Sequence, residues 1–136
     1  MAEHMREHGP MLWYPDAASR WSLIFTPAFG AWIHAKNWIA LGNEVEAKRA
    51  IACFYFSLAL VLWVLIFLPI DLVIASVLLM AGIWHFEFAK SQIAYVNKEI
   101  GEHYEKRSWR RPLSVAIGCF ILFVIFKFIL ASVACR

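Results

Sequence analysis

The sequence lacks several of the short motifs by which hydrolytic enzymes and metal sites are usually recognised. It contains no HExxH pair of histidines, no CxxC pair of cysteines, no serine nucleophile elbow and no glycine-rich phosphate loop. It also lacks a basic stripe interleaved with aromatic residues outside its apolar segments, which argues against nucleic-acid binding. These absences predict a non-enzymatic protein without a bound cofactor or metal ion.

Cysteine is scarce as well. The chain has three cysteines, Cys53, Cys119 and Cys135, an odd number without the close spacing of a zinc site. All three lie in apolar segments or at their edges, where a free cysteine usually behaves as a small packing residue. We therefore expect them to pack rather than to bind metal.

Charge is nearly absent from three long stretches of this chain, whose mean hydropathy is +0.61. Residues 50–68 carry no charge and match the ~20 residues that a helix needs to cross a membrane. In residues 113–134 the only charge is Lys127, and the aliphatic and aromatic residues around it, at roughly −0.4 kcal/mol each, outweigh its cost of about +3 kcal/mol. Residues 72–89 begin apolar and end with His85 and Glu87. Three transmembrane helices are predicted.

The first apolar segment, residues 17–41, is ambiguous because Pro27 and Gly30 interrupt it. We expect a kinked fourth span, which would place the N-terminus outside. The alternative is a re-entrant or interfacial helix with Thr26 as its cap and Pro27 at its first position. The predicted fold class is thus an all-α polytopic membrane protein, a small bundle of three to four transmembrane helices.

We expect one membrane domain over residues 1–136. Gly42 and Asn43 predict the end of one helix and the cap of the next, with Glu46 completing a capping box. The first twenty residues contain acids and prolines instead of the apolar core of a cleaved signal peptide, so the spans should be permanent. The expected segments are a polar N-terminal segment 1–16, helices 17–41, 44–68, 71–100 and 113–134, and a basic connection 90–112.

The basic connection predicts the orientation. Six of the 13 Lys and Arg residues lie in residues 90–112, so the positive-inside rule places this connection in the cytoplasm and the C-terminus outside. Three arginines lie beside Trp109 in this connection. We expect them to contact lipid phosphates. They are Arg107, Arg110 and Arg111.

Small residues predict where helices pack. With 100° of rotation per residue, Ala75, Gly82 and Ala89 share one face of the third apolar helix. Ser114 and Gly118 make a similar step in the last helix. Small residues allow helices to approach closely in lipid, so these are the expected packing positions.

Five ionisable residues are candidates for binding a partner or an ion. Asp71 is expected to cap a helix or to pair with Lys127, which helix counting places about 10 Å deeper. Glu87 is expected to pair with Lys90 or to bind a proton in a transporter. His34 and His85 should lie at similar depth, so a metal or haem site is conceivable. A metal site needs its full ligand set, and the sequence shows no pattern that supplies the other ligands.

The stretch PDAASRWSLIFTPAFGAWIHAKNWIALG, between Trp13 and Gly42, resembles a signature of small uncharacterised bacterial inner-membrane proteins. Its Ala-Ala-x-x-Trp-Ser lead, Pro-x-Phe-Gly-Ala core and Asn-Trp-x-x-Leu-Gly close cover less than a quarter of the chain. The resemblance implies a bacterial inner membrane and a first helix with a Pro/Gly break, and it brings no catalytic residues.

Two classes of function remain. The first is a protein that binds another protein in the membrane, most concretely an immunity protein against a membrane-inserting toxin, because interhelical polar contacts give specificity in lipid. The second is a small oligomeric transporter or channel subunit in which Glu87, Asp71 or Lys127 binds a proton or an ion. The expected partners are the lipid bilayer and either a membrane protein or a second copy of the chain.

Overall fold

The computed structural model describes residues 9–134 and is mostly helical, as the predicted all-α class requires. Its two short strands, β1 (Met11–Leu12) and β2 (Glu105–Lys106), pair in parallel. The helices, in chain order, are α2 (Pro15–Ile24), α3 (Pro27–Ala40), α4 (Glu44–Phe67), α5 (Ile70–Trp84), the π-helical turn η1 (His85–Ala89), α6 (Lys90–Tyr95), the π-helical turn η2 (Val96–Ile100) and α7 (Arg110–Ala134).

In the described part of the chain, three helices are long and apolar enough to cross a membrane. They are Glu44–Phe67 with 24 residues, Asp71–Ile100 with 30 residues and Arg110–Val133 with 24 residues. The second of them runs without a break from α5 through η1 and α6 to the end of η2. By length and composition, these helices match the three predicted apolar segments.

Residues 17–41 form two short helices, so the expected single kinked span is wrong. α3 begins after Thr26, whose Oγ1 accepts a hydrogen bond from the Phe29 N–H at 3.4 Å, and Pro27 occupies its first turn. α2 and α3 have 10 and 14 residues. They are about 15 and 21 Å long, and neither can cross ~30 Å of hydrocarbon. The Thr26 cap and the Pro27 first turn of the alternative are confirmed for α3, and its re-entrant or interfacial place in the membrane stays a prediction.

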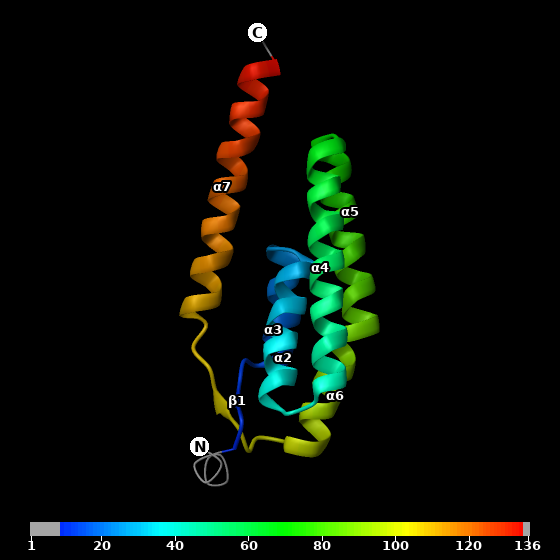
Figure 1. Ribbon diagram of the computed structural model, residues 1–136, viewed down its shortest axis with the longest axis vertical. Helices are drawn as coiled ribbons and strands as arrows, with labels where there is room; N and C mark the ends of the chain where they lie inside the picture. Colours follow the sequence, from blue (N-terminus) through cyan, green and yellow to red (C-terminus); the bar gives the residue numbers. More distant parts are fainter. Residues whose placement is uncertain (1–8, 135–136) are drawn as a thin grey trace.

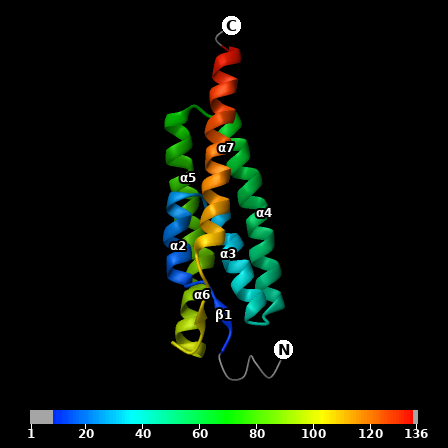
Figure 2. The same cartoon turned by 90° about the vertical axis from the view of Figure 1, so that its left-hand side faces the viewer.

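α2 and α3 run antiparallel and form a helical hairpin (Figures 1 and 2). Trp13, just before α2, is hydrogen-bonded to Asn37 near the end of α3, while Gly30 early in α3 lies against Ser22 late in α2. The chain therefore leaves the hairpin at the end where it entered, beside β1 and β2. We call this the strand end of the molecule, and the end at the α4–α5 connection, residues 68–69, the turn end.

The helix ends show which caps the sequence predicts well. Gly42 has a φ of +72°, and the Asn43 side chain accepts a hydrogen bond from the Glu46 N–H at 3.1 Å, which confirms the predicted cap of α4. Asp71 does not cap α5, because Pro69 takes the N-cap position and Asp71 lies exposed in the first turn. The predicted capping role of Asp71 is therefore wrong.

Gly30 lets the hairpin pack closely against the long helices. A Cβ atom at this position would lie 2.6 Å from the Trp84 ring and 2.8 Å from the Ser22 Cβ. Trp84 is itself buried beside Ala31 and Ala89. Only a glycine therefore fits at the point where α2, α3 and α5 meet.

The expected packing face of Ala75, Gly82 and Ala89 does not form within this chain. Ala75 is exposed and a Cβ on Gly82 would meet nothing within 4 Å, whereas Ala89 is fully buried. η1 separates Ala89 from the other two residues, because its wider turn shifts Ala89 around the helix axis relative to 100° per residue. The buried side of this long helix includes Val73, Ala81, Trp84 and Ala89.

α7 stands apart from the other helices over most of its length (Figure 1). Only 6% of the residues in its most apolar stretch are buried. Near its start, Ala116 joins a small cluster with Ala18, Phe29 and Ile33 of the hairpin. Ser114 is exposed and a Cβ on Gly118 would meet nothing within 4 Å, so these small residues pack against no helix of the described chain.

Candidate functional site

Two buried polar side chains, Asn37 of α3 and Gln92 of α6, hold the strand end together; both have no exposed surface. Asn37 Oδ1 accepts from the Trp13 N–H at 3.0 Å, and Asn37 Nδ2 donates to the Trp13 carbonyl at 2.7 Å and to Gln92 Oε1 at 3.3 Å. Gln92 Nε2 donates to the His34 carbonyl at 2.9 Å. Because each buried group depends on the others for its hydrogen bonds, this polar core favours one arrangement of the hairpin.

The same tryptophan also fixes the segment that leads to α7. Trp13 Nε1 donates to the Ser108 carbonyl at 3.1 Å, and the Arg107 guanidinium carbon lies 4.7 Å from the centre of a Trp13 ring. Leu12, in β1, is completely buried. The N-terminal segment therefore joins the hairpin to the connection before α7, a contact between distant segments that the sequence analysis did not predict.

His34 lies on the buried side of α3 in the hairpin, with 3% of its surface exposed and its ring edge-on to Trp84 at 5.1 Å between centroids. Neither of its ring nitrogens has a hydrogen-bond partner among the described residues. Burial lowers the pKa of His34 to about 3, and the charge of His85 acts in the same direction while the Pro15 carbonyl opposes it. His34 is therefore a neutral core residue at physiological pH.

His85 is fixed by a hydrogen bond between its Nδ1 and the hydroxyl of Ser19 in α2. His34 lies edge-on to Trp84, the residue before His85, so the structure brings the two histidines into one region, and their depth in a membrane stays a prediction. In residues 9–134, no group of three or more His, Cys, Asp or Glu side chains is placed to hold a metal ion.

We expect His34→Phe to preserve stability at neutral pH and to remove a pH dependence. Between pH 6.5 and about 3, the unfolded chain binds a proton at His34 that the folded chain does not. The unmodified chain should therefore lose stability as the pH falls below 6.5, by about 2 kcal/mol at pH 5 from this residue. Unfolding in detergent at pH 8 and pH 5 measures the loss, and an equal loss in His34→Phe would contradict the assignment.

Lys127 lies on the side of α7 that faces the rest of the molecule. Ala116, which contacts the hairpin, is eleven residues earlier and so about 20° away around the helix. Leu113 and Phe123 lie within about 40° of Lys127, and we call these four residues the α7 face. Among the described residues, the ion pairs and hydrogen bonds do not include Lys127.

The level of Lys127 along the molecule differs from the expected one. α7 extends beyond the α4–α5 connection in both views (Figures 1 and 2). Lys127 lies seven residues, or about 10 Å, before the end of α7 at Ala134. If α7 ended level with α4 and α5, Lys127 would lie further from the turn end. Because α7 extends beyond the α4–α5 connection, Lys127 lies closer to the level of the turn end and of Asp71. The expected pair of Asp71 with Lys127 is not formed within the chain.

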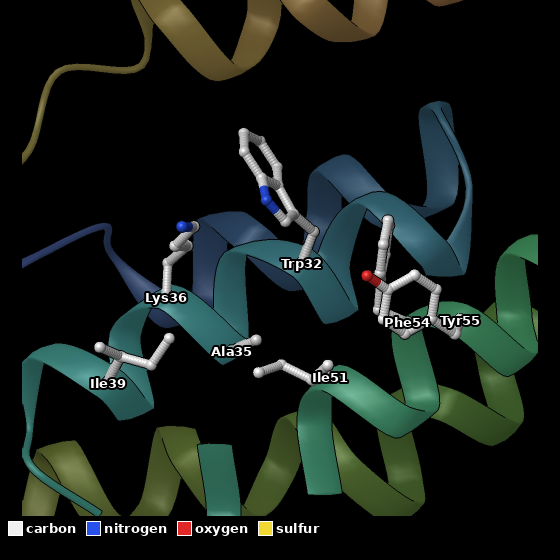
Figure 3. Close-up of a pocket in the computed structure, with 7 residues that line it drawn as sticks. All are labelled: Trp32, Ala35, Lys36, Ile39, Ile51, Phe54 and Tyr55. Atoms are coloured by element: carbon white, nitrogen blue, oxygen red, sulfur yellow. The ribbon is translucent and has the colours of Figure 1, made fainter. Parts of the chain in front are cut away.

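A pocket of about 250 Å³ opens between α3 and α4 on the side along which α7 runs (Figure 3). Trp32 and Lys36 point from α3 toward α7 in this view. The other side chains are mostly apolar, so the surface opposite α7 combines aromatic groups with one cation. The lining residues are Trp32, Ala35, Lys36, Ile39, Ile51, Phe54 and Tyr55.

Glu87 lies on the outer surface of the long helix rather than inside the bundle. It lines a shallow groove with Leu78, Leu79, Gly82, Ile83 and Phe86. The expected pair with Lys90 is not formed, because the Lys90 Nζ lies 6.0 Å above the Phe86 ring instead. Glu87 and Lys127 therefore do not line a common path through the described chain.

The basic residues before and in α7 are divided between two environments. Arg107 packs on Trp13, whereas Arg110 and Arg111 lie exposed in the first turn of α7. Their contact with lipid phosphates stays a prediction. Arg136 and Cys135, at the expected periplasmic end, lie outside the described residues.

Comparison of the chain with protein-family models, with curated proteins and with solved structures gives no match. The resemblance of its first segment to small inner-membrane proteins therefore stays a prediction, and the function has to be argued from the geometry.

Proposed function

We propose that this chain is a non-enzymatic protein of the bacterial inner membrane that binds a membrane segment of another protein. Its most concrete form is an immunity protein against a membrane-inserting toxin. In the proposed orientation the strand end, with residues 90–112, faces the cytoplasm and α7 runs toward the periplasm. The six positive charges of residues 90–112 favour this orientation.

The observation that carries the proposal is the position of Lys127. A lysine within an apolar span costs about 3 kcal/mol, and such residues are retained where they meet a partner or a water-filled space. Lys127 lies on the α7 face, yet α7 packs against its own chain mainly near Ala116. A helix of another protein that carries a carboxylate near its outer end would satisfy Lys127 and cover apolar surface of α7.

The transporter alternative has less support from the geometry. A proton or ion path would need its ionisable groups to line one interior space. Asp71 and Glu87 are exposed on the long helix, and Lys127 is on a helix that stands apart from it. The proposed partner is therefore a protein segment rather than a transported ion.

The proposal is tested by toxin challenge and cross-linking. Cells that express the chain should survive a membrane-inserting toxin encoded beside it. A photo-reactive residue at Phe123, on the α7 face, should cross-link to that toxin more strongly than one at exposed Ile125 on the same helix. Death of the expressing cells, or equal cross-linking from the two positions, would contradict the proposal.

A further inference from the structure

The pocket between α3 and α4 combines apolar walls with a single cation. Ile39, Ile51 and Tyr55 line it and are 55%, 37% and 64% exposed, so the described chain leaves much of this apolar surface uncovered. Lys36 is exposed as well, and it points from α3 toward α7 (Figure 3). A ligand that satisfies both features has an apolar body and a group that accepts hydrogen bonds from an ammonium.

Lys36 has no carboxylate partner among the described residues. The two acids in the first turn of α4 are already paired. Glu44 pairs with Lys48 at 3.9 Å, and Glu46 pairs with Arg49 at the same distance. The cation of the pocket therefore favours an anionic ligand, because a hydrogen bond between two charged groups is stronger than one between neutral groups.

The start of α7 brings further positive charge to this region. Trp32, in the wall of the pocket, and Trp109, just before α7, pack against the same cluster around Ala116. Arg110 and Arg111 follow Trp109 directly, lie exposed and belong to none of the ion pairs of the described residues. They do not line the pocket, but they add to a basic region of the kind that attracts anionic lipid headgroups.

The order of the lining residues along the molecule matches the shape of a phospholipid. Lys36 follows Trp32 by four residues in α3, so its Cα lies about 6 Å closer to the strand end. In α4, Tyr55 follows Ile51 by four residues and lies about 6 Å closer to the turn end. In the proposed orientation, the cation is therefore on the headgroup side of the pocket and the apolar wall of α4 continues toward the hydrocarbon.

We propose that this pocket binds an anionic phospholipid from the leaflet at the strand end. The Lys36 ammonium donates to a phosphate oxygen, and one acyl chain lies along α4 past Ile51 and Tyr55. The inference rests on the membrane location in the proposed function, but it uses neither Lys127 nor the toxin.

Photo-cross-linking of the full-length chain in phosphatidylcholine vesicles tests the headgroup contact. The vesicles contain a trace of phosphatidylglycerol or of phosphatidylcholine with a photo-reactive acyl chain. The phosphatidylglycerol probe should label the pocket residues roughly fivefold more strongly than the phosphatidylcholine probe. Lys36→Gln should remove most of this preference and Lys36→Arg should keep it. Lys48→Gln is the matched control, because Lys48 lies outside the pocket and is paired with Glu44.

A second pair of variants tests the acyl-chain contact. Ile51→Trp fills the pocket and should lower labelling by the phosphatidylglycerol probe severalfold. Ile66→Trp, at an exposed position of α4 outside the pocket, should leave it unchanged. A photo-reactive residue at Ile39 should cross-link to lipid.

Three results would overturn the proposal. They are equal labelling of the unmodified chain by the two probes, an equal loss in Lys36→Gln and Lys48→Gln, and cross-links from Ile39 to a second copy of the chain instead of to lipid. Since no toxin is present in these vesicles, such results would leave the proposed toxin partner in place. Failure of toxin protection would likewise leave the lipid preference unaffected.

Discussion

Replacing Asn37 by leucine is expected to destabilise the folded protein by about 3 kcal/mol or more. Leucine has a similar volume but can make none of the three side-chain hydrogen bonds of Asn37. Its introduction leaves the N–H and carbonyl of Trp13 and the Oε1 of Gln92 without this partner at the strand end. Each unsatisfied buried group costs about 1 to 3 kcal/mol. The free energy of unfolding should therefore fall by more than it does for a substitution at an exposed position.

The measurement is reversible unfolding of the chain in mixed detergent micelles, followed by the fluorescence of its tryptophans. Asn97→Leu is the matched control, because Asn97 is exposed in η2. Gln92→Leu added to Asn37→Leu should cost less than the sum of the two separate changes, since both act on one network. Similar stabilities of Asn37→Leu and Asn97→Leu would show that the polar core does not stabilise the hairpin.

Replacing Lys127 by methionine is expected to have opposite effects on binding and on stability. Methionine keeps the length of the side chain and removes a charge that costs about 3 kcal/mol within a span. The chain should therefore insert at least as well as before. Loss of a desolvated charge pair typically costs 2 to 5 kcal/mol, so capture of the partner should fall roughly thirtyfold or more.

Toxin capture from detergent extracts and survival of the expressing cells provide the two readouts. Lys98→Met serves as control, because Lys98 lies exposed in η2, next to Glu99 at 3.7 Å. The proposed role of Lys127 is contradicted if Lys127→Met retains full capture and protection. A parallel loss of both in Lys98→Met would point to a general effect of charge instead.

The features that the sequence predicts correctly are those controlled by nearby residues. The three apolar helices follow from their lack of charge, and the cap of α4 follows from Gly42 and Asn43, which act on their own turn. Thr26 and Pro27 also indicate in the sequence that the helix is interrupted there. Whether the chain continues or turns back there depends on contacts with α5, and no local pattern contains that information.

The polar core illustrates what a single sequence withholds. Asn37 and Gln92 are 55 residues apart, and Gln92 lies between two π-helical turns that change which side of the helix it occupies. Rotation at 100° per residue therefore assigns the wrong face to Ala89, which is separated from Gly82 by η1, and gives no reason to single out Gln92. Lys127 was identifiable as a candidate, but its facing direction became clear only from the contact of Ala116 with the hairpin.

The hairpin of α2 and α3 returns the chain to the end from which it entered. Single-cysteine variants, made after replacement of the three native cysteines, test it by labelling intact cells with a membrane-impermeant maleimide. Met11→Cys and Glu102→Cys should be labelled from the same side, and Asp71→Cys from the opposite side. Labelling of Met11→Cys from the Asp71 side would mean that residues 17–41 cross the membrane, and it would contradict the hairpin.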